Sequence, residues 1–166
     1  MTDDESFESF MAAALPGLLR FGHVLTGDPH RAEELVQSAL VKTYQRWGRV
    51  DQATPHAYVR AAMVNTHTSW WRRGRRESLL PSGFDIAFAA SPVGEYDDRD
   101  VALQALLSLP PKQRAVLVLR YYEDLSEADI AATLGCSTGT VKSQASRALR
   151  TLRSRLDHPS PEGALR

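Results

Sequence analysis

Basic and small polar side chains share one side of the segment between residues 137 and 156. At about 100° per residue, a helix would place the apolar side chains of this segment on one stripe. These are Val141, Ala145, Ala148, Leu149, Leu152 and Leu156. The opposite side collects Ser143, Ser146, Arg147, Arg150 and Ser154, with Lys142 at the border. Guanidinium, ammonium and hydroxyl groups on one face can pair with phosphates and hydrogen-bond to base edges.

Two helices joined by a tight turn would position this face. Residues 125–134 are predicted as a short capped helix, and Gly135 can take the left-handed position that ends it. Ser137 has the side chain of an N-cap for the helix that follows, and no Asp or Glu occurs between Asp129 and Asp157. This pattern is typical of a helix-turn-helix, whose second helix enters a major groove. An ordinary helical hairpin with a solvated basic face is the alternative that the pattern leaves open.

A second stretch, residues 56–76, mixes basic, aromatic and amide side chains. From Gln52 to Arg76 the chain has five Arg and no carboxylate. Arg can pair with phosphates, aromatic rings can stack on unpaired bases, and Asn can hydrogen-bond to base edges. Alternatively, the tryptophans are core residues and the Arg cluster is a solvated helix end, which the helix dipole would favour. Since Trp70 and Trp71 point about 100° apart on a helix, we expect one in the core and one available to a partner.

The overall charge is balanced, with 20 basic and 20 acidic residues among 166. This balance argues against a general polyanion binder, whereas two separate basic blocks suggest two contacts with one polyanion. The single cysteine, Cys136, excludes an intramolecular disulfide and fits a reducing cytoplasm. We find no signal peptide and no apolar run of membrane-spanning length. We therefore expect a soluble, cytoplasmic protein without membrane insertion.

Residues that could carry catalysis or bind a metal ion form no known motif. The five histidines, at positions 23, 30, 56, 67 and 158, lack metal-ligand spacing with carboxylates or with Cys136. The chain contains no His-Glu-x-x-His, no phosphate-cradling glycine loop and no Gly-x-Ser-x-Gly. We therefore expect no catalytic residues, no metal site and no cofactor, in a protein that is not an enzyme.

The apolar spacing predicts an all-α protein of two small helical domains joined by a linker. A helix over residues 7–26 should be kinked or broken at Pro16-Gly17. Asp28-Pro29 starts a second helix that reaches about Trp47, and Thr54-Pro55 starts a third that reaches about Trp71. Further helices are predicted at residues 101–109, 112–122, 126–134 and 137–156.

The segment of residues 74–98 differs in character from the predicted helices. It contains several Pro and Gly residues, ends in acids and has no sustained period. We interpret it as a linker in which Phe84, Ile86 and Phe88 are the residues best suited to make contacts. The predicted domains are residues 1–76 and 100–157, with a linker of residues 77–99 and a tail of residues 158–166.

Four motifs together resemble a bacterial sigma factor of the extracytoplasmic-function type, the minimal class of the sigma-70 family with only regions two and four. The first half carries Ala32-Glu33-Glu34-Leu35-Val36-Gln37-Ser38-Ala39-Leu40 and the stretch from Tyr58-Val59-Arg60 to Asn65. The second half carries Leu109-Pro110-Pro111-Lys112-Gln113-Arg114 and the stretch from Leu125-Ser126 to Gly139-Thr140-Val141-Lys142-Ser143. The combination is specific and covers nearly the whole chain. The Trp-Trp-Arg-Arg run resembles a compact subgroup of that class.

The resemblance implies a dissociable subunit that binds core RNA polymerase and directs promoter-specific initiation of transcription. The first domain would be region two, a bundle of three to four helices, and the second would be region four with its helix-turn-helix. The implied partners are the clamp helices of the polymerase β′ subunit and promoter DNA. The free protein is expected to be a monomer. An anti-sigma factor is a further candidate partner, whose presence the sequence leaves open.

The resemblance also assigns residues to three surfaces. The polymerase-docking residues would be Glu33, Glu34, Leu35, Gln37, Val41 and Lys42. The residues that hold the melted −10 strand, with one base flipped into a pocket, would be Arg60, Asn65, Trp70, Trp71, Arg72 and Arg73. The residues on the −35 duplex would be Thr140, Lys142, Ser143, Gln144, Ser146, Arg147 and Arg150. Three positions depart from the family: Glu34 replaces the usual Asp, and Gln144 and Ser146 replace basic residues that help to read the −35 element.

The sequence leaves two other function classes open. A stand-alone helix-turn-helix regulator would explain residues 126–156, and tight specific binding of duplex by the free chain would favour it. That function would leave the docking motif and the Trp-Trp-Arg-Arg run unused. A catalytic or purely structural helical protein would not copurify with RNA polymerase.

Overall fold

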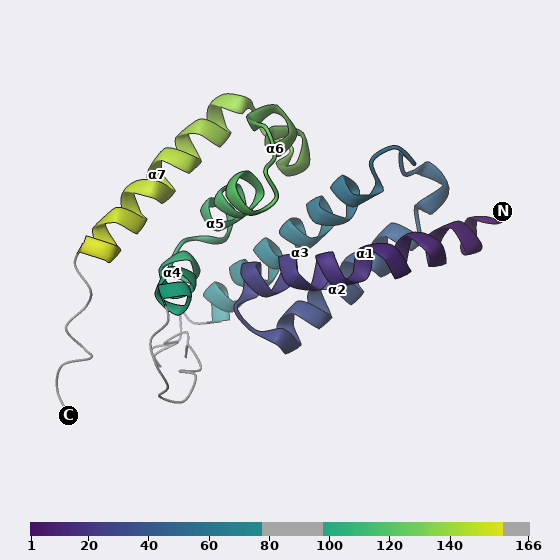
Figure 1. Cartoon of the computed structure of the whole chain (residues 1–166), viewed down its shortest axis with the longest axis horizontal. Helices are drawn as coiled ribbons and strands as arrows, with labels where there is room; N and C mark the ends of the chain where they lie inside the picture. Colours follow the sequence, from purple (N-terminus) through teal and green to yellow (C-terminus); the bar gives the residue numbers. More distant parts are fainter. Residues whose placement is uncertain (78–97, 158–166) are drawn as a thin grey trace.

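The computed structural model describes residues 1–77 and 98–157, and these ranges fold entirely into helices and their connections (Figure 1). The first half contains helices α1 (Asp3–Thr26), α2 (Pro29–Tyr44) and α3 (Pro55–Glu77), with a short helical turn η1 (Trp47–Arg49). The second contains α4 (Asp98–Leu107), α5 (Pro111–Leu117), the π-helical turn η2 (Val118–Tyr122), α6 (Glu127–Leu134) and α7 (Thr138–Asp157). The all-α prediction is confirmed for these ranges. The predicted linker contacts at Phe84, Ile86 and Phe88 and the tail of residues 158–166 lie outside them.

Helix α1 runs through Pro16 without interruption, so of the predicted kink or break the break is wrong. A proline inside a helix costs about 3 kcal/mol because it lacks the N–H donor and crowds the preceding turn. Here Pro16 lies on the exposed side, while Ala14 and Leu18 on either side of it are both buried in the core. Burial on both sides of the proline holds the two halves of α1 in one helix. Tertiary packing therefore outweighs the local signal.

The predicted start signals are confirmed at the second helix. Asp28 is the N-cap of α2, and its carboxylate accepts a hydrogen bond from the His30 backbone N–H at 2.8 Å. Pro29 occupies the first helical position, where the missing N–H is harmless. Helix α3 starts at Pro55 as predicted but continues to Glu77, beyond the predicted end at Trp71.

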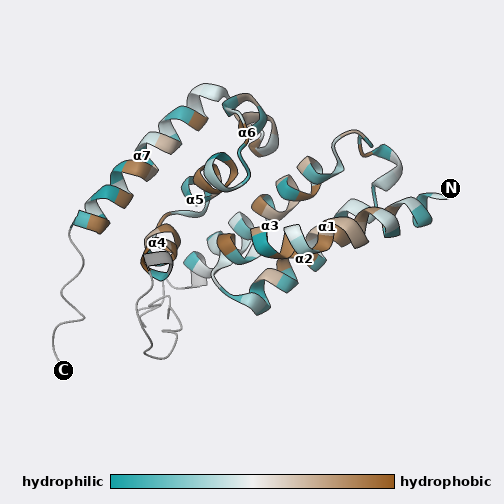
Figure 2. Ribbon diagram, viewed as in Figure 1, coloured by the Kyte–Doolittle hydropathy of each residue, from teal (hydrophilic) through white to brown (hydrophobic). Residues whose placement is uncertain are grey.

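One continuous hydrophobic core joins the two halves of the molecule. It includes Leu25, Leu35, Val59 and Met63 from the first half and Leu119, Ile130 and Val141 from the second. Helices α5 and α6 pack against α3 on one side and against α7 on the other. Figure 1 shows α7 on the side of α5 and α6 that faces away from α1–α3. Figure 2 shows hydrophobic and hydrophilic residues alternating along each helix, as amphipathic helices require.

The buried Arg114 of α5 forms hydrogen bonds with several segments of the chain. Its guanidinium donates hydrogen bonds to the carbonyl oxygens of Leu106, Leu107 and Leu109 at 3.2, 2.8 and 2.9 Å. It also donates to the carbonyl oxygen of Leu25, near the end of α1. Carbonyls at helix ends are the negative poles of those helices and suit a cation. Burial lowers the pKa of Arg114 to about 10, so the side chain keeps its charge at neutral pH.

Gly27 lies in close contact with Leu107 of α4. It ends α1 with a φ of 74°, and a Cβ atom there would lie 2.5 Å from Leu107 Cδ1. We predict that Gly27→Ala lowers the free energy of unfolding by about 2–4 kcal/mol, the sum of left-handed backbone strain and overpacking. Urea denaturation followed by circular dichroism measures this loss.

Gly135→Ala is the matched control for this prediction. Gly135 is also left-handed, with a φ of 66°, but a Cβ atom there would meet nothing within 4 Å. Its expected loss is the backbone part alone, about 1–2 kcal/mol. Equal losses in the two variants would contradict a tight contact between Gly27 and Leu107.

Candidate nucleic-acid interface

Helices α6 and α7 form the predicted helix-turn-helix, and local hydrogen bonds set its boundaries. Ser126 Oγ accepts from the Asp129 N–H at 3.1 Å at the start of α6, and Gly135 ends that helix in the left-handed conformation. Ser137 Oγ then accepts from the Thr140 N–H at 3.1 Å at the start of α7. These contacts confirm the predicted caps and the predicted C-terminal glycine. Residues next to the turn in the sequence therefore determine where α6 ends and where α7 begins.

The two faces of α7 separate as the sequence pattern predicts. Val141, Ala145 and Ala148 are buried against α5 and α6. The opposite face holds the side chains assigned to the −35 duplex. Thr140, Lys142, Ser143, Ser146, Arg147 and Arg150 are exposed, and Gln144 is half-buried. The face is polar and basic, and it carries no acid before Asp157, the last residue of the helix.

Lys142 is the one member of this set that the described residues hold in an ion pair. Its Nζ lies 3.7 Å from a carboxylate oxygen of Glu127, which also pairs with Arg120 at 3.3 Å. Ion pairs this exposed contribute no more than about 1 kcal/mol. The pair therefore positions Lys142 near the start of α7 without preventing it from turning to another anion.

Helix α3 presents the residues assigned to the −10 strand in different ways. Asn65, Arg72 and Arg73 are exposed, so they are available to a partner. Trp70 is half-buried and packs against the core. Trp71 is also half-buried, and the Arg75 guanidinium lies 4.7 Å from the centre of its ring. Both tryptophans are half-buried and only Trp70 packs against the core, so the expected division into one core and one available ring is only partial.

Arg60 differs from the other residues assigned to the −10 strand. Its side chain is only 18% exposed, and its Nε lies 3.5 Å from a carboxylate oxygen of Glu123, just after η2. Arg60 therefore faces the second half of the molecule instead of open solvent. The sequence pattern places Arg60 on α3 but contains no signal for this distant carboxylate.

The residues assigned to polymerase docking lie mostly on the outer face of α2. Glu34, Gln37, Val41 and Lys42 line a shallow open groove of about 490 Å³, and Glu33 is exposed nearby. Val41 is 57% exposed, an unusual position for an aliphatic side chain. Lys42 Nζ donates to the hydroxyl of Thr66 on α3 at 2.9 Å, which ties the groove to that helix.

Leu35 does not belong to this surface. Its side chain is fully buried, with 0% exposure, in the core shared by α1, α2 and α3. The assignment of Leu35 as a docking contact is corrected accordingly, because a side chain without exposed area cannot touch a partner. The helical spacing itself places Leu35 on the same stripe as Ala39 and Thr43, which are also 0% exposed. Leu35 instead anchors α2 in the core, beneath the exposed residues assigned to docking.

His67 is a residue that the sequence pattern did not single out. It lies on α3, and its Nε2 is 3.4 Å from an Arg114 guanidinium nitrogen. Burial, followed by the nearby charges of Arg114 and Arg31, lowers its pKa from 6.5 to about 4. The ring is therefore neutral near pH 7, and Nε2 can accept a hydrogen bond from Arg114. Only the folded chain brings this pair together.

Comparison with known proteins supports both halves of the resemblance. The family model described as "Sigma-70 region 2" matches residues 10–77, and the one described as "Sigma-70, region 4" matches residues 99–152. The chain is 41% identical over 152 residues to the RNA polymerase sigma-E factor of Streptomyces avermitilis, covering 91% of this chain and 85% of that protein. It is 32% identical over 142 residues to the ECF RNA polymerase sigma factor SigL of Mycobacterium tuberculosis, covering 82% and 80% of the two. The chain belongs to the extracytoplasmic-function sigma factors of the sigma-70 family.

A solved structure of another sigma factor matches the fold over nearly its whole length. This is RpoE from Bartonella quintana, crystallised in complex with the anti-sigma factor NepR. The TM-score is 0.75 at 28% sequence identity, covering 94% of this chain and 99% of that chain. The helices α1–α3 of this sigma factor therefore form region 2, and α4–α7 form region 4. The compact subgroup suggested by Trp-Trp-Arg-Arg stays a prediction.

Metal-binding clusters and membrane-spanning helices are not found in the same ranges of the sigma factor. Among residues 1–77 and 98–157, no three His, Cys, Asp or Glu side chains cluster in a way that could hold a metal ion. No helix in these ranges is both long and apolar enough to cross a bilayer.

The His67–Arg114 pair predicts a specific pH dependence of stability. Because the folded state lowers the pKa of His67, the unfolded state binds a proton first as the pH falls. The stability contributed by neutral His67 is complete above pH 6.5 and is lost between pH 6.5 and about 4. We predict that the wild-type protein loses about 2 kcal/mol more than His67→Gln between pH 7 and 4.5. Glutamine retains an acceptor for Arg114 but does not titrate.

Urea denaturation at several pH values measures this difference. The carboxylates titrate alike in both proteins, so their effects cancel when the two pH profiles are subtracted. Parallel profiles for wild type and His67→Gln would contradict a buried neutral histidine at this position.

Proposed function

We propose that this sigma factor binds core RNA polymerase and directs initiation at specific promoters, with α7 on the −35 duplex and α3 on the −10 strand. The observation that carries the proposal is the division of α7 into a buried apolar face and an exposed basic face that holds no acid before the final residue, Asp157. A helix of this kind fits the major groove of B-DNA. Membership of the sigma family supplies the polymerase as the partner.

In this proposal, the residues of the α7 face make three kinds of contact with DNA. Arg147 can form two hydrogen bonds with a guanine, and Gln144 can do the same with an adenine. Lys142 and Arg150 would neutralise phosphates, which sets the register of the helix but reads no sequence. Thr140, Ser143 and Ser146 would add shorter hydrogen bonds to bases or phosphates. Gln144 and Ser146 replace basic residues, so this helix is expected to rely less on charge for base recognition.

Helix α3 would hold the non-duplex strand at the −10 element. Taking a base out of the stack costs a few kcal/mol of stacking and pairing energy. Stacking on an aromatic ring returns about 1–3 kcal/mol per base, and Trp71 is a half-buried ring on this helix that is not among those packed against the core. Asn65 would hydrogen-bond to the edge of the captured base. Arg72 and Arg73 would pair with the adjoining phosphates, while Trp70 would support the site from the core.

The outer face of α2 would bind the clamp helices of the polymerase β′ subunit. Its groove offers both charge and apolar area, from Glu34, Gln37, Val41 and Lys42, and Glu33 is exposed nearby. The exposed Val41 would be covered in the complex, which gives the contact a hydrophobic centre with a polar rim.

The free chain would be a cytoplasmic monomer, with region 2 over residues 1–76, a linker over residues 77–99 and region 4 over residues 100–157. Regulation by an anti-sigma factor fits the likeness to RpoE, which was crystallised with one. The protein would act as an initiation factor without catalytic residues of its own.

Reconstituted transcription tests the proposal directly. We expect core polymerase plus this protein to initiate at a promoter that core polymerase alone ignores. Sequencing the 5′ ends of transcripts made on fragmented genomic DNA identifies such promoters whatever their sequence. A stand-alone regulator would instead bind its duplex tightly without polymerase and add no specific initiation. That result would reject the proposal.

Two alanine variants separate the roles of the two helices. Arg147→Ala should weaken −35 recognition by about tenfold, since a bidentate contact with guanine contributes about 1–3 kcal/mol. Asn65→Ala should leave closed-complex binding near wild type and reduce promoter melting. Filter binding measures the first step, and permanganate reactivity of unpaired thymines measures the second. Each variant is the control for the other, and equal losses at both steps for Asn65→Ala would contradict its assigned role.

A further inference from the structure

A carboxylate lies beside the start of the proposed DNA-reading helix, although α7 itself carries no acid before Asp157. This carboxylate belongs to Glu127, the first residue of α6, and its two oxygens face cations from two other elements. Oε1 lies 3.3 Å from Arg120 Nη1 of η2, and Oε2 lies 3.7 Å from Lys142 Nζ of α7. Glu127 therefore joins three helical elements of region 4 through one side chain.

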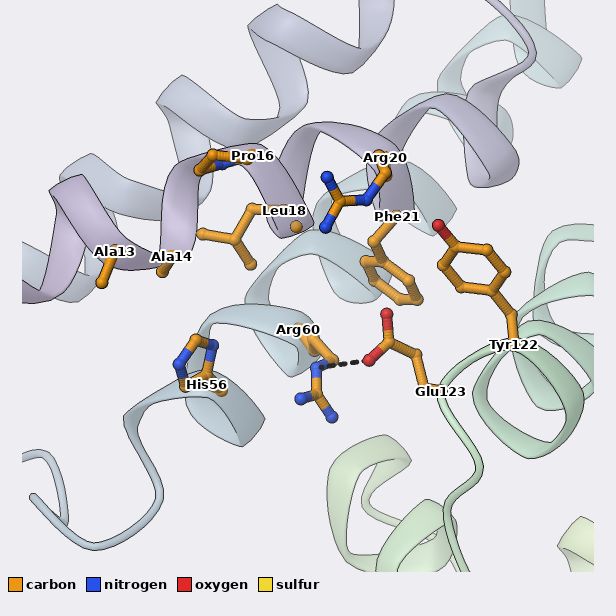
Figure 3. A pocket seen from close by; sticks show the side chains of 11 residues that line it. Ala13, Ala14, Pro16, Leu18, Arg20, Phe21, His56, Arg60, Tyr122 and Glu123 are labelled. Carbon is orange, nitrogen blue, oxygen red and sulfur yellow. Dashed lines mark ion pairs between the residues drawn. The ribbon is translucent and has the colours of Figure 1, made fainter.

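Two neighbouring carboxylates of region 4 are held by other partners. Figure 3 shows Glu123, just after η2, in its ion pair with Arg60 of α3. Asp129 accepts a hydrogen bond from the Ser126 hydroxyl at 2.8 Å, within the cap of α6. Among residues 98–157, Glu127 is therefore the acid that forms an ion pair with α7.

The two cations beside Glu127 are not held equally. Arg120 donates a hydrogen bond to Glu127, and its guanidinium also lies 5.6 Å from the centre of the Tyr121 ring. Lys142 lies beyond hydrogen-bond distance, and its side chain is 67% exposed, compared with 38% for Arg120. Because an ammonium carries three N–H donors, Lys142 can contact a phosphate while it stays beside Glu127. The charge of Arg120 then reduces the repulsion between Glu127 and that phosphate.

The position of a lysine decides whether its phosphate contact depends on the DNA sequence. A free lysine on its flexible four-carbon stem can follow any phosphate, so it adds equally to specific and nonspecific binding. A lysine held beside a carboxylate reaches only the phosphates close to that carboxylate. When α7 docks in another register, Lys142 must either leave Glu127, which weakens binding, or make no phosphate contact. Nonspecific binding is weaker in both cases.

We propose that Glu127 is a positioning residue, which keeps the Lys142 ammonium at one phosphate beside the −35 element and thereby sharpens the discrimination between promoter and other DNA. This inference rests on the proposed function, since it requires α7 in the major groove. An exposed ion pair changes an equilibrium constant by up to about fivefold. We therefore expect Glu127 to raise the specificity of −35 binding by about two- to fivefold.

NMR of the free protein tests the ion pair without polymerase or DNA. The chain contains only three lysines, at positions 42, 112 and 142, so each gives its own Cε–Hε signal in a carbon–proton correlation spectrum. Glu127→Gln should shift the signal of Lys142 and leave the signals of Lys42 and Lys112 in place. An unmoved Lys142 signal would overturn the proposal, because Glu127 would then not hold this side chain.

Competition between two promoters for the reconstituted holoenzyme measures the effect on specificity. The promoters share one −10 element and carry either an intact or a scrambled −35 element, so the contributions of core polymerase and α3 cancel in the ratio of affinities. Glu127→Gln should lower this ratio about two- to fivefold, by tightening binding to the scrambled promoter. Asp100→Asn, which changes an exposed acid of α4 and the net charge equally, should leave the ratio unchanged. An unchanged ratio for Glu127→Gln would overturn the proposal.

Salt dependence and a double substitution separate positioning from a loss of structure. On the scrambled promoter, Glu127→Gln should steepen the slope of log affinity against log salt concentration by up to about one, since Lys142 is free to neutralise one more phosphate. In a Lys142→Gln background, Glu127→Gln should change neither the slope nor the ratio. Equal effects of Glu127→Gln with and without Lys142 would overturn the positioning role.

The same promoters distinguish failure of this inference from failure of the proposed function. If the wild-type holoenzyme did not discriminate between the intact and the scrambled −35 element, the proposed function would fail and this inference with it. If wild type and Glu127→Gln discriminated equally well, the inference alone would fail and the proposed function would stand.

Discussion

The structure depends on one buried cation surrounded by carbonyl oxygens. Arg114 places its guanidinium among the chain ends of α4 and α1, where it meets four backbone acceptors and the neutral His67 ring. A buried charge without partners would cost several kcal/mol. Here the helix ends solvate the charge, and in return the charge satisfies carbonyls that those helix ends leave unpaired. The same side chain thereby closes region 4 internally and joins it to region 2.

Helices α2 and α7 each bury one face in the core and expose the other. Leu35 and Ala39 of α2 are buried, while Glu34, Gln37 and Val41 on its outer side line an open groove. Helix α7 repeats this division with buried Ala145 and Ala148 against exposed Ser146 and Arg147. Because packing holds the buried faces rigidly, the exposed side chains are presented on a fixed frame. This rigidity suits recognition, since little further ordering is needed on binding.

The contact between regions 2 and 4 limits how the side chains of α3 are presented to a partner. Each region is complete in its own helices, yet their apolar cores are continuous and Arg60 is turned toward Glu123. The most compact arrangement therefore hides one cation of α3 and leaves the basic face of α7 open.

The sequence by itself determined the features that arise within a turn or two of the chain. Caps at Asp28, Ser126 and Ser137, the end of α6 at Gly135 and the two faces of α7 all follow from neighbours within about four residues. The motifs of regions 2 and 4 identified the family for the same reason. Only the tertiary structure decided that α1 continues through Pro16, that Arg60 meets Glu123 and that Arg114 reaches Leu25, 89 residues away. Such contacts depend on how whole helices pack, and local spacing carries no record of that packing.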